Sequence, residues 1–396
     1  MNKNALTFIL IVVCLDTLSF GIIYPVLPKL LEDITGTNLS KASIYGGWLT
    51  AIYALLQFLF SPIIGSLSDK FGRKPILLIS LLALSIDCLF LAFAKNIVWF
   101  FVGRAIAGIA GASYSAAAAS IADISNENNR TAHFGYINAA YSSGFIIGPA
   151  IGGILGDISI RLPFIFSAVI CFLNFLFGVL LYKETLPYEK RRKLKIDFNT
   201  VVSGFLNLQK LKLIFPLLVA LFFMAVSSHS MPSVWSYFTM EKFNWDTQLV
   251  GYSLAFLGIL SLVVQTYGVK FFSKKFGDHK MTGLGILFSI FGLLLITFSF
   301  HPLLLIPALI LYNIGSINRA GFQSIASKKT PLDQQGELQG TIASINSLAT
   351  ILAPLIMTNT FRYFTTEETP IYFPSAPYLI ATFLSVVALI FFRTLK

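Results

Sequence analysis

The sequence is poor in charge, cysteine and histidine, and each shortage excludes a class of protein. Only 12% of its 396 residues are charged and 56% are hydrophobic, a composition suited to a chain surrounded by lipid rather than to a soluble globule. The three cysteines, Cys14, Cys88 and Cys171, lie in apolar runs and predict neither a disulfide framework nor a metal site. The sequence has no H-E-x-x-H motif, no metal-spaced Cys/His cluster and no Ser/His pair in a catalytic motif, so we expect neither an enzyme nor a cofactor.

Long polar stretches of the kind that build soluble domains are also scarce. Apolar runs of the length that crosses a bilayer, roughly 20 residues, fill the chain instead. The first run carries Asp16 and has no small-residue cleavage site, so we interpret it as a retained span and not as a signal peptide. The runs predict twelve membrane helices at residues 5–27, 44–64, 75–94, 98–122, 132–156, 161–182, 213–240, 248–272, 281–299, 302–326, 335–361 and 374–393.

Positive charge is in excess, with 29 Lys and Arg against 18 Asp and Glu. If the number of spans is even and both termini are cytoplasmic, most of these cations fall in cytoplasmic segments, as the positive-inside rule requires. We therefore predict a multi-pass protein of the bacterial inner membrane with both termini in the cytoplasm. The charge reflects topology and contact with lipid, and it does not indicate nucleic acid.

The longest polar stretch divides six predicted spans from six. This predicts an N-terminal six-helix lobe at 1–182, a cytoplasmic linker at 183–212 and a C-terminal six-helix lobe at 213–396. The basic run 189–195 favours a solvated linker with affinity for anionic lipid, and a partner-binding site is the alternative.

A tight turn joins the second and third predicted spans at residues 65–75. Gly65 and Gly72 permit close approach or positive φ there. The pattern G-x-x-x-D-x-x-G-R-K, which contains Asp69 and Arg73, resembles the signature loop of the major facilitator superfamily. A plain positively charged cytoplasmic loop is the alternative interpretation.

The second half repeats this turn weakly. Phe276-Gly277 follows Phe71-Gly72 by 205 positions and again lies between the second and third spans of its half. Such a decayed duplication is typical of two-lobed transporters with parallel halves.

Two acids and an arginine lie inside predicted spans: Asp16, Asp87 and Arg104. An ionised carboxylate in hydrocarbon costs several kcal/mol, so each acid must face a cavity, pair with a cation or take a proton. Arg104 cannot discharge and needs an anionic neighbour or water; Asp16 is the partner that we expect. A structural ion pair or a hydrogen-bonded neutral acid remains the alternative.

The fifth span contains the pattern G-x-x-x-G-P-x-x-G-G, made by Gly144, Gly148, Pro149, Gly152 and Gly153. Proline removes one helix hydrogen bond, and the glycines flatten a face for close helix packing. The pattern resembles the antiporter signature of the superfamily's exporters. A kinked packing helix is the plainer interpretation.

Along almost its whole length the chain resembles tetracycline/proton antiporters and related twelve-span drug exporters of this superfamily. The resemblance implies an all-α membrane protein of two pseudo-symmetric six-helix lobes, with proton transfer on Asp16, Asp87 and Arg104. It also implies a cytoplasmic gate built from Gly65, Asp69, Gly72, Arg73 and Asp123. Where tetracycline exporters carry a His in span eight and an Asp in span nine, this chain has Ser261 and Ser289, so tetracycline is in question as the substrate.

Further polar residues lie inside spans, and each is a candidate either for a substrate cavity or for an interhelical hydrogen bond. His229 is able to titrate near neutral pH. Arg319 has no carboxylate within a span of its own half, so it is either a counter-charge for an anionic substrate or a side chain that reaches the interface. The set is Gln57, Asn138, Tyr141, His229, Gln265, Asn313, Arg319, Gln323 and Asn346.

We predict a monomeric, proton-coupled secondary transporter that exports a small amphipathic drug or metabolite by alternating access, with the proton as coupling ion. The antiporter-like fifth span favours export. One alternative is transport, in either direction, of an anionic, carboxylate-rich metabolite such as a siderophore. A second alternative is a transporter-like membrane sensor that binds ligand without flux.

Overall fold

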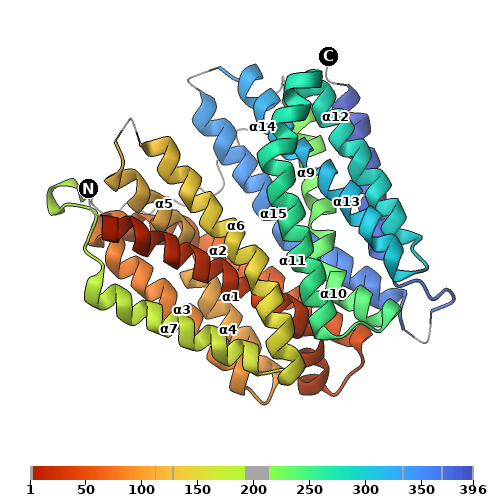
Figure 1. Ribbon diagram of the computed structural model, residues 1–396, viewed down its shortest axis with the longest axis horizontal. Coiled ribbons are helices and arrows are strands. Elements are labelled where there is room, and N and C mark those ends of the chain that lie inside the picture. The colour runs from red at the N-terminus through yellow and green to blue at the C-terminus, as the bar shows by residue number, and fades with distance from the viewer. Residues whose placement is uncertain are drawn as a thin grey trace. The chain divides into compact units, whose positions relative to one another are not determined.

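The computed structural model describes residues 3–111, 113–126, 129–191, 214–331, 334–366 and 369–394, and within these ranges the regular structure is helical with no strand (Figure 1). Eleven of its segments are long and apolar enough to cross a membrane. One of them, Thr247–Thr297, has 51 residues and a helical length of ~75 Å, more than twice the ~30 Å of a hydrocarbon core. The backbone of this segment is not helical at Gly277, so the segment holds two spans. The predicted all-α fold of twelve spans is confirmed.

Within each half of the chain, the described helices follow one another with short connections. In the first half they are α1 (Lys3–Thr35), α2 (Leu39–Phe71), α3 (Arg73–Phe93), α4 (Ile97–Ala110), α5 (Ser113–Ile124), α6 (Arg130–Ile158) and α7 (Leu162–Leu181). In the second half they are α9 (Phe215–Ser228), α10 (Ser230–Phe243), α11 (Thr247–Val263), the π-helical turn η4 (Val264–Gly268), α12 (Val269–Thr297), α13 (Leu305–Gly315), α14 (Ile317–Lys329), α15 (Gln335–Tyr363) and α16 (Ala376–Arg393). Short 3₁₀ turns lie at Tyr188–Lys190 and Pro302–Leu304.

Three predicted spans are each divided into two α-helices at a break. The span predicted at 98–122 is divided into α4 and α5, that at 213–240 into α9 and α10 at His229, and that at 302–326 into α13 and α14 at Ser316. Hydropathy does not reveal such breaks, because the residues at them are small or weakly polar and the apolar run continues through them.

The chain forms two compact units. The first unit is Met1–Thr37, Ile52–Phe198 and Asp246–Ala255, and the second is Asn38–Ala51, Asn199–Trp245 and Phe256–Lys396. Each unit therefore contains the first turns of one helix whose remainder belongs to the other unit, namely α11 in the first and α2 in the second. The predicted linker at 183–212 lies outside the described residues from 192 onward.

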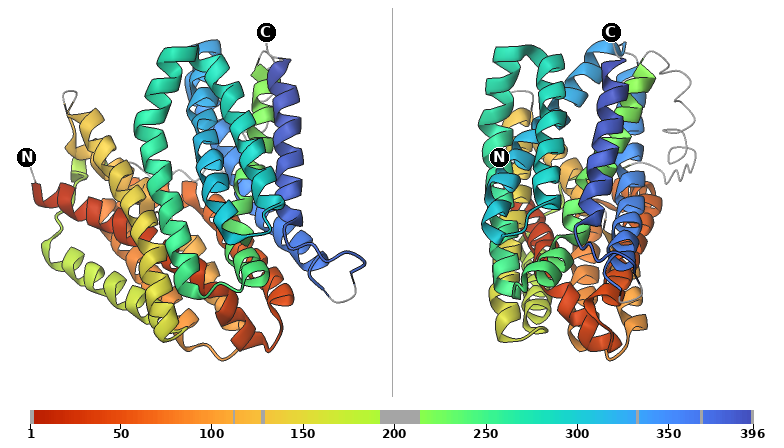
Figure 2. Two further views of the ribbon diagram at one scale, coloured as in Figure 1. Left: turned by 45° about the vertical axis from the view of Figure 1, so that its right-hand side comes forward. Right: turned by 90° about the vertical axis from the view of Figure 1, so that its right-hand side faces the viewer.

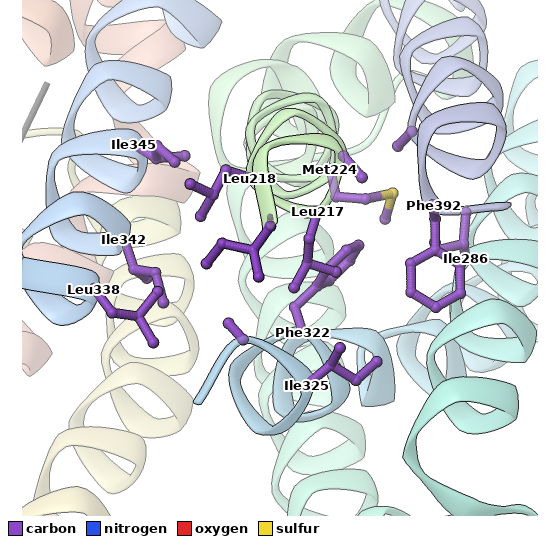
Figure 3. Packing of buried hydrophobic residues seen from close by; sticks show 14 of the residues in the cluster. Leu217, Leu218, Met224, Ile286, Phe322, Ile325, Leu338, Ile342, Ile345 and Phe392 are labelled. Atoms are coloured by element: carbon purple, nitrogen blue, oxygen red, sulfur yellow. The ribbon is translucent and has the colours of Figure 1, made fainter. Parts of the chain in front are cut away.

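Each unit has its own apolar core. In the first unit α1 packs closely on α6, and side chains such as Phe8, Leu77 and Ile121 are fully buried. In the second unit α9 and α16 lie side by side, as both views of Figure 2 show. Leu218 of α9, Phe322 of α14 and Phe392 of α16 belong to the cluster drawn in Figure 3. Because leucine gains nothing over lipid here, close packing rather than burial from water holds these helices together.

Candidate functional site

The turn between α2 and α3 consists of one residue, Gly72. Its φ of 106° and ψ of 164° lie in a region that only glycine adopts readily. Gly65 is different: it lies inside α2, it has no positive φ, and a methyl group built on it meets nothing within 4 Å. We predicted that both glycines permit close approach or positive φ; Gly72 has the positive φ, whereas Gly65 has neither, because α2 continues as a helix to Phe71.

Arg73 follows this turn and joins two carboxylates. Its Nε donates to Asp123 Oδ2 at 2.9 Å, and its Nη1 donates to Asp69 Oδ1 at 2.6 Å and to Ser68 Oγ at 3.0 Å. The arginine is 8% exposed, so these charge-assisted hydrogen bonds are partly shielded from water. The structure brings the predicted gate residues Asp69, Arg73 and Asp123 together and ties the α2–α3 turn to the end of α5.

Glu184, just after α7, holds the same turn from the other side. Its carboxylate accepts hydrogen bonds from the backbone N–H groups of Arg73 at 2.8 Å and Lys74 at 3.1 Å, the first residues of α3. The helix dipole favours a carboxylate at this end, and the glycine N-cap has no side chain of its own to accept these bonds. Glu184 was not among the residues predicted from the sequence, where its position directly after the sixth span is the only signal for it.

The buried ion pair of the first unit joins Arg104 of α4 to Asp87 of α3. Arg104 Nε donates to Asp87 Oδ1 at 3.1 Å, and its Nη2 contacts Oδ2. Asp87 is 0% and Arg104 6% exposed. We predicted Asp16 as the partner of Arg104, and the ion pair that the structure shows for Arg104 is with Asp87. Asp87 of the third span approaches Arg104 closely because Gly103, beside Arg104, has no side chain to separate α4 from Asp87: a methyl group there would lie 2.8 Å from Asp87 Oδ1.

Asp16 and Tyr53 lie near this pair. Asp16 on α1 is half-buried and interacts electrostatically with Tyr53 on α2. The Arg104 guanidinium lies over the Tyr53 ring at 5.5 Å, a cation–π distance. All three predicted proton-coupling residues therefore lie in one unit, with Tyr53 as a neighbour that sequence analysis did not single out.

The antiporter-like helix α6 uses its glycines for contact on two sides. Gly148 faces Gly21 of α1, and a methyl group at Gly148 would lie 3.0 Å from the Gly21 Cα. Gly144 and Gly152 likewise approach the backbone of α1. On another face, a methyl group at Gly153 would lie 3.0 Å from the Cα of Gly251 in α11. The motif thus lets α6 pack without side chains between it and its neighbours, as the kinked-packing interpretation requires; it has no polar group of its own.

Polar side chains from neighbouring helices bind the backbone at the three helix breaks. Gln57 Nε2 donates to Gly111 O at 2.7 Å in the first unit, and Gln265 Nε2 contacts Ser316 Oγ at 3.1 Å and its carbonyl oxygen at 3.4 Å in the second. At the third break, the carbonyl oxygen of Ser228 has no helical hydrogen bond from residue 232, because Pro232 has no backbone N–H. Tyr312 Oη donates to that carbonyl oxygen at 3.2 Å.

The other predicted cavity residues have varied surroundings. Asn313 and Asn346 donate to carbonyl oxygens of their own helices at 3.2 and 3.0 Å, which suits packing rather than ligand binding. His229 Nε2 lies 3.1 Å from Thr350 Oγ1. Arg319 is exposed, and in the described part of the chain no carboxylate lies within ion-pair distance of it. The side chains of Gln323, which donates to Gln339 at 2.9 Å, and of Asn138 and Tyr141 are also exposed.

Ser289, the residue in place of the exporters' Asp, is buried in the second unit. Asn318 Nδ2 lies 3.4 Å from its hydroxyl group, and a methyl group on Gly315 would collide with it. The Ser289 hydroxyl group therefore lies in the contact between α12 and the α13–α14 break, where it packs against Gly315 and Asn318.

The described residues form a multi-pass membrane bundle with a charge-bearing turn between its second and third spans and a buried ion pair. The family model of the Major Facilitator Superfamily matches residues 9–354 and 217–396, and the chain belongs to this family. It is therefore a transporter of small molecules and not an enzyme.

Individual relatives agree with this assignment. The chain is 38% identical to tetracycline resistance protein, class C, of Escherichia coli over 90% of this chain and 89% of the relative. It is 35% identical to the class H protein of Pasteurella multocida over 92% and 90%. A crystal structure of a mutant of the nucleoside transporter NupG has the same fold, with a TM-score of 0.80 and 15% identity over 99% of both chains.

Proposed function

We propose that this protein is a proton-coupled exporter of small amphipathic drugs or metabolites, working by alternating access in the bacterial inner membrane with both termini in the cytoplasm. The observation that carries the proposal is the Asp87–Arg104 ion pair, inside two membrane helices and beside a third polar helix position, Asp16. Relatives named for tetracycline resistance support export as the direction. The protein acts as a monomer, needs no cofactor and uses the proton as its coupling ion.

The two acids have different tasks in this proposal. Asp16 is half-buried, whereas Asp87 is fully buried against a cation, so a proton reaches Asp16 more readily. Protonation of Asp16 changes the electrostatic field at Tyr53 and Arg104 and so biases the equilibrium between inward-open and outward-open states. Substrate and proton compete for this one equilibrium, which is all that coupling requires.

The test is transport by purified protein in liposomes with an imposed pH gradient and tetracycline as the first compound. Asp16→Asn should abolish gradient-driven transport in these liposomes while exchange at equal pH persists, because the variant still binds and moves substrate. Asp33→Asn is the control, since Asp33 is an exposed acid on the same helix α1. Full gradient dependence in Asp16→Asn would remove that residue from the coupling role, and absence of any flux in the wild type would favour the sensor alternative.

A second candidate substrate class is the carboxylate-rich anion. Arg319 favours it, because this exposed cation lies one turn beyond the α13–α14 break and has no carboxylate within ion-pair distance among the described residues. Arg319→Gln should raise KM for an anionic substrate by about tenfold, the loss expected for one charge-assisted contact, and leave KM for a neutral one unchanged. Arg319→Lys should retain part of the affinity. Equal effects on both substrates would exclude the counter-charge role.

A further inference from the structure

The α2–α3 turn has a geometric copy in the second unit. Gly277 interrupts α12 with φ 73° and ψ 163°, and Gly72 has φ 106° and ψ 164°. The two glycines are 205 positions apart. Both conformations are nearly restricted to glycine, so the same unusual turn has been kept between the second and third spans of each half.

The side chains around the two turns correspond in position and are opposite in charge. Directly after the glycine stands Arg73 in the first unit and Asp278 in the second. Each binds the serine five residues earlier: Arg73 donates to Ser68 at 3.0 Å, and Asp278 accepts from Ser273 at 2.9 Å.

Each also pairs with a partner 50 residues later. Arg73 binds Asp123 at 2.9 Å, at the end of α5, and Asp278 binds Lys328 at 2.6 Å, at the end of α14. In both units the member next to the glycine is the more buried one, with side-chain exposures of 9% for Arg73 and 16% for Asp278 against 21% and 72% for their partners. Four positions therefore agree at one offset, although both charged positions have changed sign.

Arg73 and Asp278 each bind one further side chain, and the type of that side chain follows from the opposite charge of the two residues. In the first unit Asp69 gives Arg73 a second carboxylate at 2.6 Å. The corresponding residue of the second unit is Lys274, which is exposed; instead Ser324 of α14 donates to Asp278 at 2.5 Å. A half-buried anion such as Asp278 needs hydrogen-bond donors, whereas a buried cation such as Arg73 needs acceptors. The residues around each central charge are of the kind that it needs.

We propose that Asp278 and Lys328, with Ser273 and Ser324, form the second unit's counterpart of the Arg73–Asp123 network with the charges exchanged, and that they are positioning residues for the transport cycle. The pair fastens the eighth-to-ninth-span turn to the end of the tenth span, as Arg73 fastens its own turn to the end of the fourth. The inference rests on the proposed transport function.

The experiment compares Lys328→Asp, Asp278→Lys and the double exchange Asp278→Lys/Lys328→Asp in liposomes, with rates normalised to folded protein. Each single variant places like charges together and should slow transport by about tenfold, the effect of losing one charge-assisted hydrogen bond. The double variant restores the pair in the polarity of the first unit and should regain most of the rate. Lys280→Asp is the matched control, because it makes the same charge change at an exposed residue just beyond the turn.

Hydrogen exchange of the backbone around residues 277–282 gives an independent measurement that needs no substrate. It should speed up in both single variants and return to the wild-type rate in the double variant. Unchanged exchange in the single variants, or failure of the double exchange to restore either measurement, would overturn the inference. So would faster exchange with normal transport, since the network would then be structural only. Wild-type protein that does not move any test compound would instead count against the proposed function, and the exchange data would still decide whether the pair holds the turn.

Discussion

Asp87 and Arg104 place two full charges inside helices where apolar side chains would carry no cost of removal from water. Their mutual attraction offsets much of the cost of removing each from water, but the pair adds little net stability compared with an apolar replacement. Removing one member alone is far worse, since the other remains buried and uncompensated. Such an arrangement is kept for a task other than stability.

We expect Asp87→Asn to destabilise the folded protein by about 3–5 kcal/mol, because Arg104 then stays 6% exposed without its carboxylate. The measurement is the thermal unfolding midpoint in detergent. Asp33→Asn, which removes the 3.5 Å contact between exposed Asp33 and Arg161, should change stability by less than about 1 kcal/mol. Similar effects from both variants would mean that the buried pair is not electrostatically coupled.

The glycines of the α2–α3 hairpin should differ in tolerance. Gly72→Ala should cost about 1–3 kcal/mol for its backbone conformation, and more because the new methyl group would collide with the Glu184 carboxylate. Gly65→Ala should be neutral or stabilising by about 0.5–1 kcal/mol, because Gly65 is in a helix with free space beside it. Thermal unfolding of the two variants tests the ranking, and a worse result for Gly65→Ala would contradict it.

The membrane-spanning helices were predictable from the sequence, but the breaks within them were not. The twelve apolar runs were legible because the bilayer demands a nearly continuous apolar stretch of helical length. The breaks at Gly111, His229 and Ser316 were not legible, because they depend on donors from other helices, Gln57, Tyr312 and Gln265. A polar residue in a span was predicted to bind either substrate or another helix, and only the structure shows which carbonyl it meets.

The capping of α3 by Glu184 can be measured by hydrogen exchange of the first amide groups of that helix. Glu184→Ala removes the acceptor of the Arg73 and Lys74 amide groups, so these amides should exchange with solvent faster, with an expected loss of about 0.5–2 kcal/mol. Hydrogen exchange with peptide resolution at residues 73–78 is the measurement. Glu189→Ala, an exposed acid on the same connection, should leave that peptide unchanged; an equal effect would show that charge, and not capping, is responsible.

The Asp278 network predicts a pH dependence with a defined sign. Hydrogen bonds from Lys328, then Ser324 and Ser273, lower the pKa of Asp278 from 3.8 to about 2 in the connection between the eighth and ninth spans. A carboxylate with a depressed pKa adds stability above its unfolded pKa and loses it as pH falls through the folded value. The stability difference between wild type and Asp278→Asn should therefore be constant above pH 5 and shrink between about pH 4 and pH 2. A difference independent of pH would contradict the shift.

For the whole molecule, the family and the twelve-span fold were accessible from the sequence because the turn at 65–75 and the hydropathy agree with one another. The partner of Arg104 was not accessible, since Asp16 and Asp87 are equally plausible until helix rotations are known. The second network was missed for another reason. Asp278 and Arg73 have opposite charges, so aligning the two halves by residue identity does not match them. The ion pairs do match, because the partner residues Lys328 and Asp123 also have opposite charges.

The orientation of the protein in the membrane can be tested at its C-terminus. Because Lys and Arg gather in the segments assigned to the cytoplasm, a fluorescent protein fused after Lys396 should fold and fluoresce in cells. Alkaline phosphatase at the same place should stay inactive, since it needs an oxidising compartment. An active phosphatase fusion would reverse the assigned orientation.

The way α2 and α15 meet has a consequence for a divided protein. Ser40 donates to the Arg362 carbonyl oxygen, Thr365 donates to Ser40, and Gly47 lies against Thr358, so the opening turns of α2 are held by a helix encoded more than three hundred residues later. If the chain were divided at the linker, the first turns of α2 would lack their contacts with the second half, and the first turns of α11 would lack their contacts with the first half. Expressed separately the two polypeptides should be degraded, and produced together they should rescue one another by complementation.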